Sequence, residues 1–347
     1  MSSPQTDTQP LISLGLKLDR GRLLLLDQQA LPAAETWIDA TDPYQMIAAI
    51  QALKVRGAPL IGVAAGLCLG LYARTADPGK TRAVAARLRA ARPTAVNLMW
   101  AIDRLLPLAD QPEQLYQQAV AIFHEDVELC RSMGQHGADL IADGDGILTH
   151  CNTGGLATAG IGTALGVIRT AWEQGKAIHV YVDETRPLLQ GGRLTAWELE
   201  QLGIPYTLIT DSMAAIQMRA GRIQKVFLGA DRVAVNGDFA NKVGTYSVAV
   251  NAHFHGIPFY PVAPYSTIDV HCASGSAIEI EQRSADEVRG AAGSFGSVIW
   301  APATATVDNP AFDYTPVELV TALVSDRGVY TRGDLQAGEL EEVGRRS

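Results

Sequence analysis

The chain of 347 residues lacks paired cysteines, long apolar runs and an excess of positive charge. Its cysteines are scattered, which argues against a disulfide framework or a zinc site and favours reduced thiols in a cytoplasmic protein. No apolar run approaches the roughly 18 residues of a membrane span, so we expect no membrane partner. The net charge of −9 argues against nucleic acid, because neutralising its phosphates requires a basic face. The four cysteines are Cys68, Cys130, Cys151 and Cys272.

What remains is a globular composition, with 47% hydrophobic and 19% charged residues, long enough for two domains. We expect residues 1–135 to form an N-terminal domain that starts with a β-hairpin or small sheet between Leu11 and Trp37. A helical bundle follows, and we expect Pro59 to open a helix whose glycines pack closely. The predicted helices are 43–54, the one opened by Pro59, Thr81–Ala91, Thr94–Leu106 and Gln111–Met133.

The pattern changes from Gly146 onward, where apolar runs rich in β-branched residues alternate with helical segments. This alternation predicts an α/β fold with a Rossmann-like parallel sheet and helices on both faces over residues 136–347. We expect about the last 15 residues, after Thr331, to form a loosely held tail. The predicted strands are 146–151, 177–183, 205–209, 225–230 and 257–262.

The segment Ile147–Gly155 carries the most information in the chain. A short apolar run ends in Cys151, and a Gly pair then leads into a helical pattern predicted from Leu156 to Gln174. A helix N-terminus stabilises anions and lowers the pKa of a nearby thiol. Ligands of open α/β sheets bind at the carboxyl ends of the strands. We therefore predict a chemical site at Cys151.

Other predicted strands also end in polar residues. Asp183 follows one strand, Asp211 and Ser212 another, and capping is the favoured role of the last two. Asp231 ends the apolar run from Val226, where desolvation would raise its pKa toward the range of a general acid. The alternative for Asp231 is a salt bridge with Arg232.

Two arginines precede predicted helices, as expected of phosphate ligands. Arg56 stands before the helix opened by Pro59, and Arg92 precedes Pro93-Thr94. Together with Lys242, they predict a phosphate clamp contributed by both domains. Gln190 lies on a Gly-rich loop suited to closing over a substrate.

The histidines and glycines predict neither a metal nor a nucleotide cofactor. On a strand, His150 and Cys151 point to opposite faces, so a Cys–His pair is not expected. His253 and His255 have the wrong helical spacing to share a ligand. The glycines from Gly160 to Gly166 do not match the dinucleotide-binding fingerprint, and we expect them inside a helix.

Six motifs in register, between about residues 11 and 330, resemble the S-methyl-5-thioribose-1-phosphate isomerases of methionine salvage. The resemblance implies a cofactor-independent aldose–ketose isomerase that acts as a homodimer, with Cys151 and Asp231 as its catalytic pair. It implies further substrate contacts at Arg56, Gly57, Ala58, Arg92, Gln190, Asn241 and Lys242. The motifs are Val55–Val63, Arg92–Leu98, Thr149–Gly154, Asp183–Gly191, Gly229–Asp238 and Asn241–Tyr246.

The same motifs also resemble those of two other kinds of protein. Regulatory subunits of the translation initiation exchange factor share the fold without turnover, but the resemblance implies that they lack the Cys151–Asp231 pair. Isomerases of ribose 1,5-bisphosphate or 5-deoxyribose 1-phosphate would keep it, although Pro59 and Thr153-Gly154 look more like the methylthioribose type. A substrate panel separates these alternatives.

Overall fold

The computed structural model describes residues 9–92, 96–294 and 296–345 and contains two compact units. The first unit comprises the described parts of Met1–Ala30 and Ala34–Val127, together with Gly155–Gly160. The second comprises Leu31–Ala33, Glu128–Gly154 and the described part of Ile161–Ser347. That each half folds as a domain, with a boundary near residue 135, stays a prediction. No helix in the described part of the chain is both long and apolar enough to cross a membrane.

The first unit opens with an antiparallel sheet, as the sequence predicts for Leu11 to Trp37. Arg20 and Gly21 both have positive φ, of 47° and 76°, which suits the tight turn between its second and third strands. Most leucines of these strands are buried in one core with the helices of the same unit: Leu11, Leu16, Leu18, Leu23 and Leu25. The strands, in sheet order, are β1 (Leu11–Ile12), β2 (Leu16–Asp19), β3 (Arg22–Leu26) and β4 (Trp37–Asp39).

The helices of the first unit pack closely around α2, the helix that Pro59 was expected to open. Asp42 caps α1 by accepting hydrogen bonds from Tyr44 N and Gln45 N. A Cβ at Gly62 would lie 2.6 Å from the Asn97 carbonyl oxygen, so a larger side chain there would separate α2 from α4. The helices are α1 (Pro43–Gln51), α2 (Ala58–Ala73), α3 (Pro78–Arg89), α4 (Val96–Leu105) and α5 (Pro112–Ala138), whose last residues belong to the second unit.

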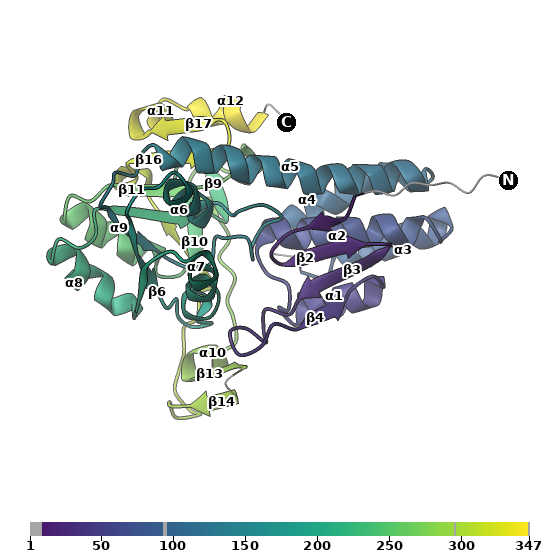
Figure 1. Ribbon diagram of the computed structural model, residues 1–347, viewed down its shortest axis with the longest axis horizontal. Helices are drawn as coiled ribbons and strands as arrows, with labels where there is room; N and C mark the ends of the chain where they lie inside the picture. The colour runs from purple at the N-terminus through teal and green to yellow at the C-terminus, as the bar shows by residue number, and fades with distance from the viewer. Residues whose placement is uncertain (1–8, 93–95, 295, 346–347) are drawn as a thin grey trace. The chain divides into compact units, whose positions relative to one another are not determined.

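A seven-stranded sheet forms the centre of the second unit, and it confirms the predicted Rossmann-like fold (Figure 1). Six strands are parallel, in the sheet order β7-β6-β5-β8-β11-β16, and β17 pairs antiparallel with β16 at the edge. The last two strands were not predicted. The strands are β5 (Gly146–Thr149), β6 (His179–Asp183), β7 (Tyr206–Ile209), β8 (Lys225–Gly229), β11 (Phe259–Val262), β16 (Ala322–Ser325) and β17 (Gly328–Thr331).

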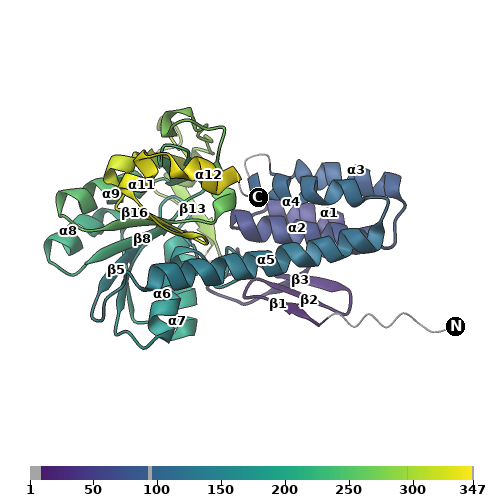
Figure 2. The same cartoon turned by 90° about the horizontal axis from the view of Figure 1, so that it is seen from above.

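Helices cover both faces of this sheet. Successive side chains of a strand point to opposite faces, so each strand contributes to two cores. Ile147 and Phe227 join a core with the end of α5, α6 (Ala164–Glu173) and α7 (Ala196–Leu202). Leu148 and Leu228 join a core with α8 (Ala214–Arg219) and α9 (Thr245–Phe254) on the other face. Figure 2 shows the sheet between these two sets of helices.

Smaller elements follow β8. A four-stranded sheet has the order β12-β9-β10-β15, and a two-stranded hairpin pairs β13 with β14. The strands are β9 (Arg232–Ala234), β10 (Phe239–Lys242), β12 (Ile268–Asp269), β13 (Gly290–Gly293), β14 (Gly296–Ile299) and β15 (Phe312–Thr315), and α10 (Asp286–Arg289) precedes the hairpin.

The expectation of a loosely held tail after Thr331 is wrong for its described residues. α11 (Arg332–Gln336) begins with a capping box between Thr331 and Asp334, and α12 (Glu339–Arg345) follows. Leu335 and Leu340 are buried in the same core as α8 and α9. Glu339, Glu341 and Glu342 are exposed on the outer face of α12.

Candidate functional site

Cys151 and Asp231 follow two neighbouring strands at the point where the strand order of the sheet reverses. β5 pairs in parallel with β6 on one side and with β8 on the other, so chain order runs outward in both directions from the β5–β8 pair. In doubly wound sheets, ligands bind outside the carboxyl ends of the strands at this switch point. The two residues expected to be catalytic therefore leave the sheet where its topology favours a ligand.

Cys151 has a constrained backbone and a partly accessible thiol. Its φ of +67° lies in the left-handed region, which is uncommon for residues other than glycine and often marks functional sites. Its N–H donates to Thr185 Oγ1 at 2.9 Å, and its carbonyl accepts from Thr195 Oγ1 at 2.6 Å. None of the four cysteines forms a disulfide, and the other three are buried, so Cys151 is the thiol that a ligand can reach.

The helix predicted from Leu156 is wrong in its first half, since α6 begins only at Ala164. Gly162, with φ of +98°, bridges to Gly154 and breaks the helical path. Gly160 and Gly162 therefore precede the helix instead of lying inside it. Thr153 joins this turn to α6, because its side-chain oxygen accepts from Leu165 N at 3.1 Å. The helix N-terminus does not directly follow Cys151 in sequence, so its action on the thiol stays a prediction.

Asp231 differs from the expectation of a desolvated carboxyl. β8 ends at Gly229, and Asp231 is exposed at the bend before β9, so its own strand does not bury it. The alternative was a salt bridge between Asp231 and Arg232. Arg232 pairs with Asp269, to which its Nε donates at 2.8 Å.

Gln190 is fully buried beside an irregular helical turn. A π-helical turn spans Gly191–Thr195 directly after it, and such turns are frequent at functional sites. Neither the oxygen nor the nitrogen of its amide has a hydrogen-bond partner in the part of the chain that the structure describes. Leaving a buried amide unpaired is costly, so this side chain is suited to a polar ligand.

Asn241 and Lys242, at the end of β10, are buried and have partners within the protein. Asn241 Nδ2 donates to Thr245 Oγ1 at 2.9 Å, and Lys242 Nζ donates to the Ala311 carbonyl at 2.6 Å. Lys242 also lies 4.2 Å from the centre of the Phe312 ring. The ammonium group is therefore held in a defined position and is not a solvated surface charge.

The predicted contacts at the start of α2 belong to the first unit. Gly57 caps α2 with φ of +79°, a conformation that favours glycine. The N–H of Leu60 donates to the Ala157 carbonyl at 3.1 Å, and Pro59 has no N–H. Of the first three helical residues, Ala58 is then the one whose N–H this helix can offer to an anion. Arg92 is half-buried, whereas residues 93–95 of its motif lie outside the described residues.

His150, which the sequence analysis set aside, forms a buried pair with Asp183. Its Nδ1 lies 3.0 Å from Asp183 Oδ2, and its Nε2 lies 3.0 Å from the Val243 carbonyl oxygen. Burial alone would lower the pKa of His150, but the bond and charge of Asp183 raise it above its ordinary value. Burial raises the pKa of Asp183 to about 6. The place of His150 directly before Cys151 was the only signal for this pair in the sequence.

His150, Asp183 and Asp211 have the composition of a metal site, but their atoms are committed elsewhere. One potential ligand atom from each residue lies within 4.8 Å of the others. Both ring nitrogens of His150 face protein acceptors, and the Asp211 carboxylate accepts from Thr185 N at 2.8 Å and Arg186 N at 2.7 Å. A hydrogen-bonded cluster explains the short distances.

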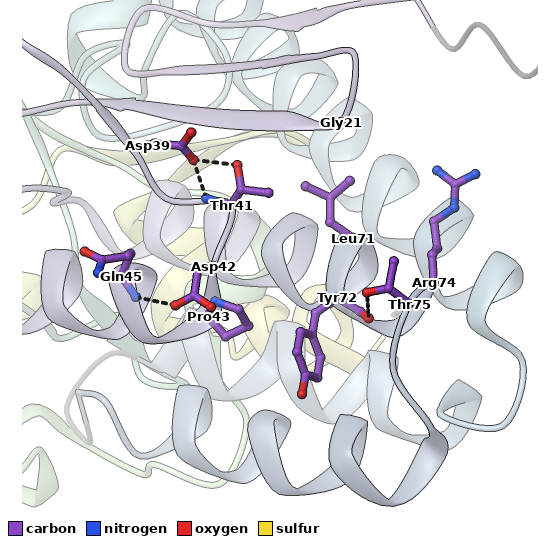
Figure 3. Close-up of a pocket in the computed structure, with 10 residues that line it drawn as sticks. All are labelled: Gly21, Asp39, Thr41, Asp42, Pro43, Gln45, Leu71, Tyr72, Arg74 and Thr75. Carbon is purple, nitrogen blue, oxygen red and sulfur yellow. Dashed lines mark hydrogen bonds between the residues drawn. The ribbon is translucent and has the colours of Figure 1, made fainter.

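The first unit has an open pocket of about 1010 Å³ that contains none of the predicted site residues (Figure 3). Four of its polar side chains, those of Asp39, Thr41, Asp42 and Thr75, bond to one another or to the backbone, and Arg74 pairs with Glu113. Asp39 accepts from Thr41, Asp42 caps α1, and Thr75 Oγ1 donates to the Tyr72 carbonyl. We assign no ligand to this pocket.

Comparison with known proteins gives consistent results over almost the whole chain. Residues 54–332 match the model of the "Initiation factor 2 subunit family". A methylthioribose-1-phosphate isomerase of Klebsiella pneumoniae (strain 342) is 54% identical over 334 residues, which cover 95% of this chain and 98% of the relative.

Two solved structures share the fold at substantial identity. The structure described as 5-methylthioribose 1-phosphate isomerase from Pyrococcus horikoshii OT3 has a TM-score of 0.89 and 39% identity, and covers 99% of both chains. A structure described as the delta subunit of translation initiation factor eIF-2B from A. fulgidus has a TM-score of 0.84 and 42% identity, and covers 94% of this chain and 99% of that one.

Proposed function

Since the chain belongs to the initiation factor 2 subunit family, whose members include isomerases as well as translation factors, we propose that it is a methylthioribose-1-phosphate isomerase of methionine salvage. It converts S-methyl-5-thio-α-D-ribose 1-phosphate to S-methyl-5-thio-D-ribulose 1-phosphate. The observation that carries this proposal is the placement of Cys151 and Asp231 after the two strands of the switch point. A regulatory subunit would have no need of a reachable thiol and a carboxylate there.

The chemistry of this substrate requires two proton-handling groups. Phosphate on the anomeric oxygen prevents the sugar ring from opening as a free aldose does. In the isomerisation the ring oxygen gains a proton as its bond to C1 breaks, the C2 hydroxyl loses one, and a hydrogen moves from C2 to C1. Asp231 serves as the acid and Cys151 as the second proton-handling group. These steps balance without a cofactor, and we propose that the enzyme uses none.

Arg56, Gly57, Ala58, Arg92, Gln190, Asn241 and Lys242 are the substrate contacts of this proposal. Two observations support them. The buried amide of Gln190 lacks a protein partner among the described residues, as a ligand-binding amide in an unliganded enzyme would. The ammonium of Lys242 is fixed by the Ala311 carbonyl and the Phe312 ring, so little side-chain entropy is lost when it binds a phosphate.

We further propose a cytoplasmic homodimer. Tyr246, Val250 and Phe254 recur at intervals of four residues on α9 and are 47%, 41% and 82% exposed, so they form one apolar stripe. Ile216 of the neighbouring α8 is 54% exposed. Exposed apolar patches of this kind mark association sites. Phe254→Glu should lower the molecular mass measured by sedimentation equilibrium toward that of the monomer. A mass equal to that of wild type would show that this stripe is not the dimer interface.

A substrate panel tests the function. The purified protein is assayed with methylthioribose 1-phosphate, 5-deoxyribose 1-phosphate and ribose 1,5-bisphosphate, and kcat/KM is compared. We expect the highest kcat/KM for methylthioribose 1-phosphate. Preference for the bisphosphate would show the sister activity instead, and no turnover of any of the three would favour a regulatory subunit.

A further inference from the structure

His150 joins two segments of the second unit that carry proposed site residues. It is the last residue before Cys151, at the end of β5, and its side chain is fully buried. Its Nε2 lies 3.0 Å from the carbonyl oxygen of Val243, the residue after Lys242. A single side chain therefore connects the strand end that bears the thiol with the turn that bears the ammonium.

The two partners of the ring determine where its protons lie. A backbone carbonyl can only accept, so Nε2 donates to Val243. On the other side, Nδ1 faces the carboxylate of Asp183 at 3.0 Å. A neutral histidine can donate from one nitrogen only, so donation to both partners requires an imidazolium, and hydrogen bonds between charged groups are stronger than neutral ones.

Other contacts hold both ends of this connection. Thr185 Oγ1 donates to the Asp183 carbonyl at 3.0 Å and accepts from Cys151 N at 2.9 Å. At the other end, a Cβ added at Gly244 would lie 2.8 Å from His150 Cε1, so the turn approaches the ring as closely as only glycine allows. His150 thus lies between two segments whose backbones are fixed against it.

The charges around the ring favour its cationic form. Asp183 of β6 contacts it directly, Asp211 after β7 raises its pKa, and Asp313 of β15 is close enough to be influenced by the ring charge. Lys242 is the positive group on β10, and its charge also acts on Asp313. Three carboxylates therefore face two cations, which leaves a protonated histidine electrostatically compensated.

We propose that His150 is a positioning residue of the isomerase: donating from both ring nitrogens, it holds the Cys151 strand end and the Lys242–Val243 turn in fixed relation. This inference rests on the proposed function, in which Cys151 handles a proton and Lys242 contacts the substrate. His150 itself does not act on the substrate.

Three variants test the proposal by steady-state kinetics. His150→Gln keeps one donor nitrogen, which cannot reach both partners, and His150→Phe has no donor for either. Losing a hydrogen bond between charged groups typically lowers the equilibrium constant that depends on it by roughly ten- to a hundredfold. We expect kcat/KM to fall by that factor in His150→Gln and further in His150→Phe, with both kcat and KM affected. His136→Gln is the control, because it also removes a histidine contact to a backbone carbonyl, that of Ser325, in the same unit.

Two measurements need no substrate and separate this inference from the proposed function. In the ¹⁵N-histidine spectrum of the wild-type protein, one buried ring should show two directly bonded N–H signals, both of which disappear in His150→Gln. Reductive methylation of the buried Lys242 should be faster in His150→Gln than in wild type or His136→Gln.

The outcomes are distinct. An inactive wild-type protein would overturn the proposed function, whereas these two measurements would still decide on the connection made by His150. A single N–H signal from the His150 ring would overturn the imidazolium. Kinetics within twofold of wild type in His150→Gln, with only a lowered melting temperature, would show a purely structural residue. If His150→Phe fails to fold, His150→Gln and the wild-type spectrum still decide the question.

Discussion

Cys151 and Asp231 follow strands that pair directly with each other, since Leu148 of β5 is in register with Val226 of β8. They are separated by 80 positions in sequence, yet the chain leaves the sheet at both residues on the same edge, because parallel strands end on the same side. The sheet topology therefore places both residues just beyond neighbouring strand ends, where the proposed isomerisation would need them.

We expect Cys151 to react with iodoacetamide before the other cysteines. Cys68, Cys130 and Cys272 are buried, and burial raises the pKa of Cys68 above its ordinary value, which keeps it a thiol. Mass-spectrometric mapping after brief labelling measures the order, and bound substrate should protect Cys151. Cys151→Ser should fold normally and lose nearly all turnover. Earlier modification of another cysteine, or full activity after labelling of Cys151, would remove it from the site.

The phosphate contacts are expected to contribute individually to binding. Replacing Arg56, Arg92 or Lys242 by Ala should weaken substrate affinity by roughly ten- to a hundredfold, because each removes a charge-assisted hydrogen bond. Inorganic phosphate should inhibit competitively. Arg219→Ala, on α8, is a control for the loss of one positive charge. Affinity within twofold of wild type in all three variants would show that these residues do not bind the phosphate.

Replacing Gln190 by Met should separate stability from binding. The substitution preserves the length of the side chain and removes two buried polar atoms that lack partners among the described residues. We expect the melting temperature of the unliganded protein to stay the same or rise, while KM increases by roughly tenfold. Thermal unfolding and steady-state kinetics on the same preparation measure the two effects. A lower melting temperature with unchanged KM would show that the amide stabilises the fold and does not bind substrate.

Asp126 of α5 should make the stability of the protein depend on pH. Burial raises its pKa to about 6, although its carboxylate accepts a hydrogen bond from Ala159 N at 2.6 Å. Because the folded-state pKa lies above the unfolded value, its contribution to stability is complete below about pH 4 and is lost as the pH rises through about 6.

Asp126→Asn removes this titration, so the difference in unfolding free energy between wild type and the variant should change with pH. We expect wild type to lose about 3 kcal/mol relative to Asp126→Asn between pH 4 and pH 8, at about 1.4 kcal/mol per pKa unit. Urea unfolding across this range measures the difference, with the exposed Asp139→Asn as the control. A constant difference between wild type and Asp126→Asn would contradict the shift.

Local sequence patterns predicted the elements that depend on local forces. The small sheet between Leu11 and Trp37 and the close packing of the glycines after Pro59 follow from local backbone and side-chain size. The alternation of strands and helices from Gly146 onward predicted the parallel sheet. The helix expected from Leu156 failed because Gly162 adopts a positive φ and bridges to Gly154. That bridge is a tertiary feature which helical spacing does not reveal.

The candidate site shows the same limit. The motifs identified Cys151 and Asp231, but the exposure of Asp231 and the pairing of Arg232 with Asp269 depend on where β8 ends and where β12 lies. His150 was set aside because adjacent residues on a strand point to opposite faces. Its partners, Asp183 and Val243, lie on segments 33 and 93 residues away, and only the folded chain brings them to its ring.

The central claim, that Asp231 is the acid of an isomerase, is tested most directly by the kcat of Asp231→Asn with methylthioribose 1-phosphate. Asparagine keeps the size and hydrogen-bonding capacity of the side chain but cannot deliver a proton. We predict that kcat falls by about 10²–10⁴-fold, the usual contribution of a general acid–base group, while the substrate still binds and the melting temperature is unchanged. A stable Asp231→Asn enzyme with a kcat within about tenfold of wild type would contradict the account.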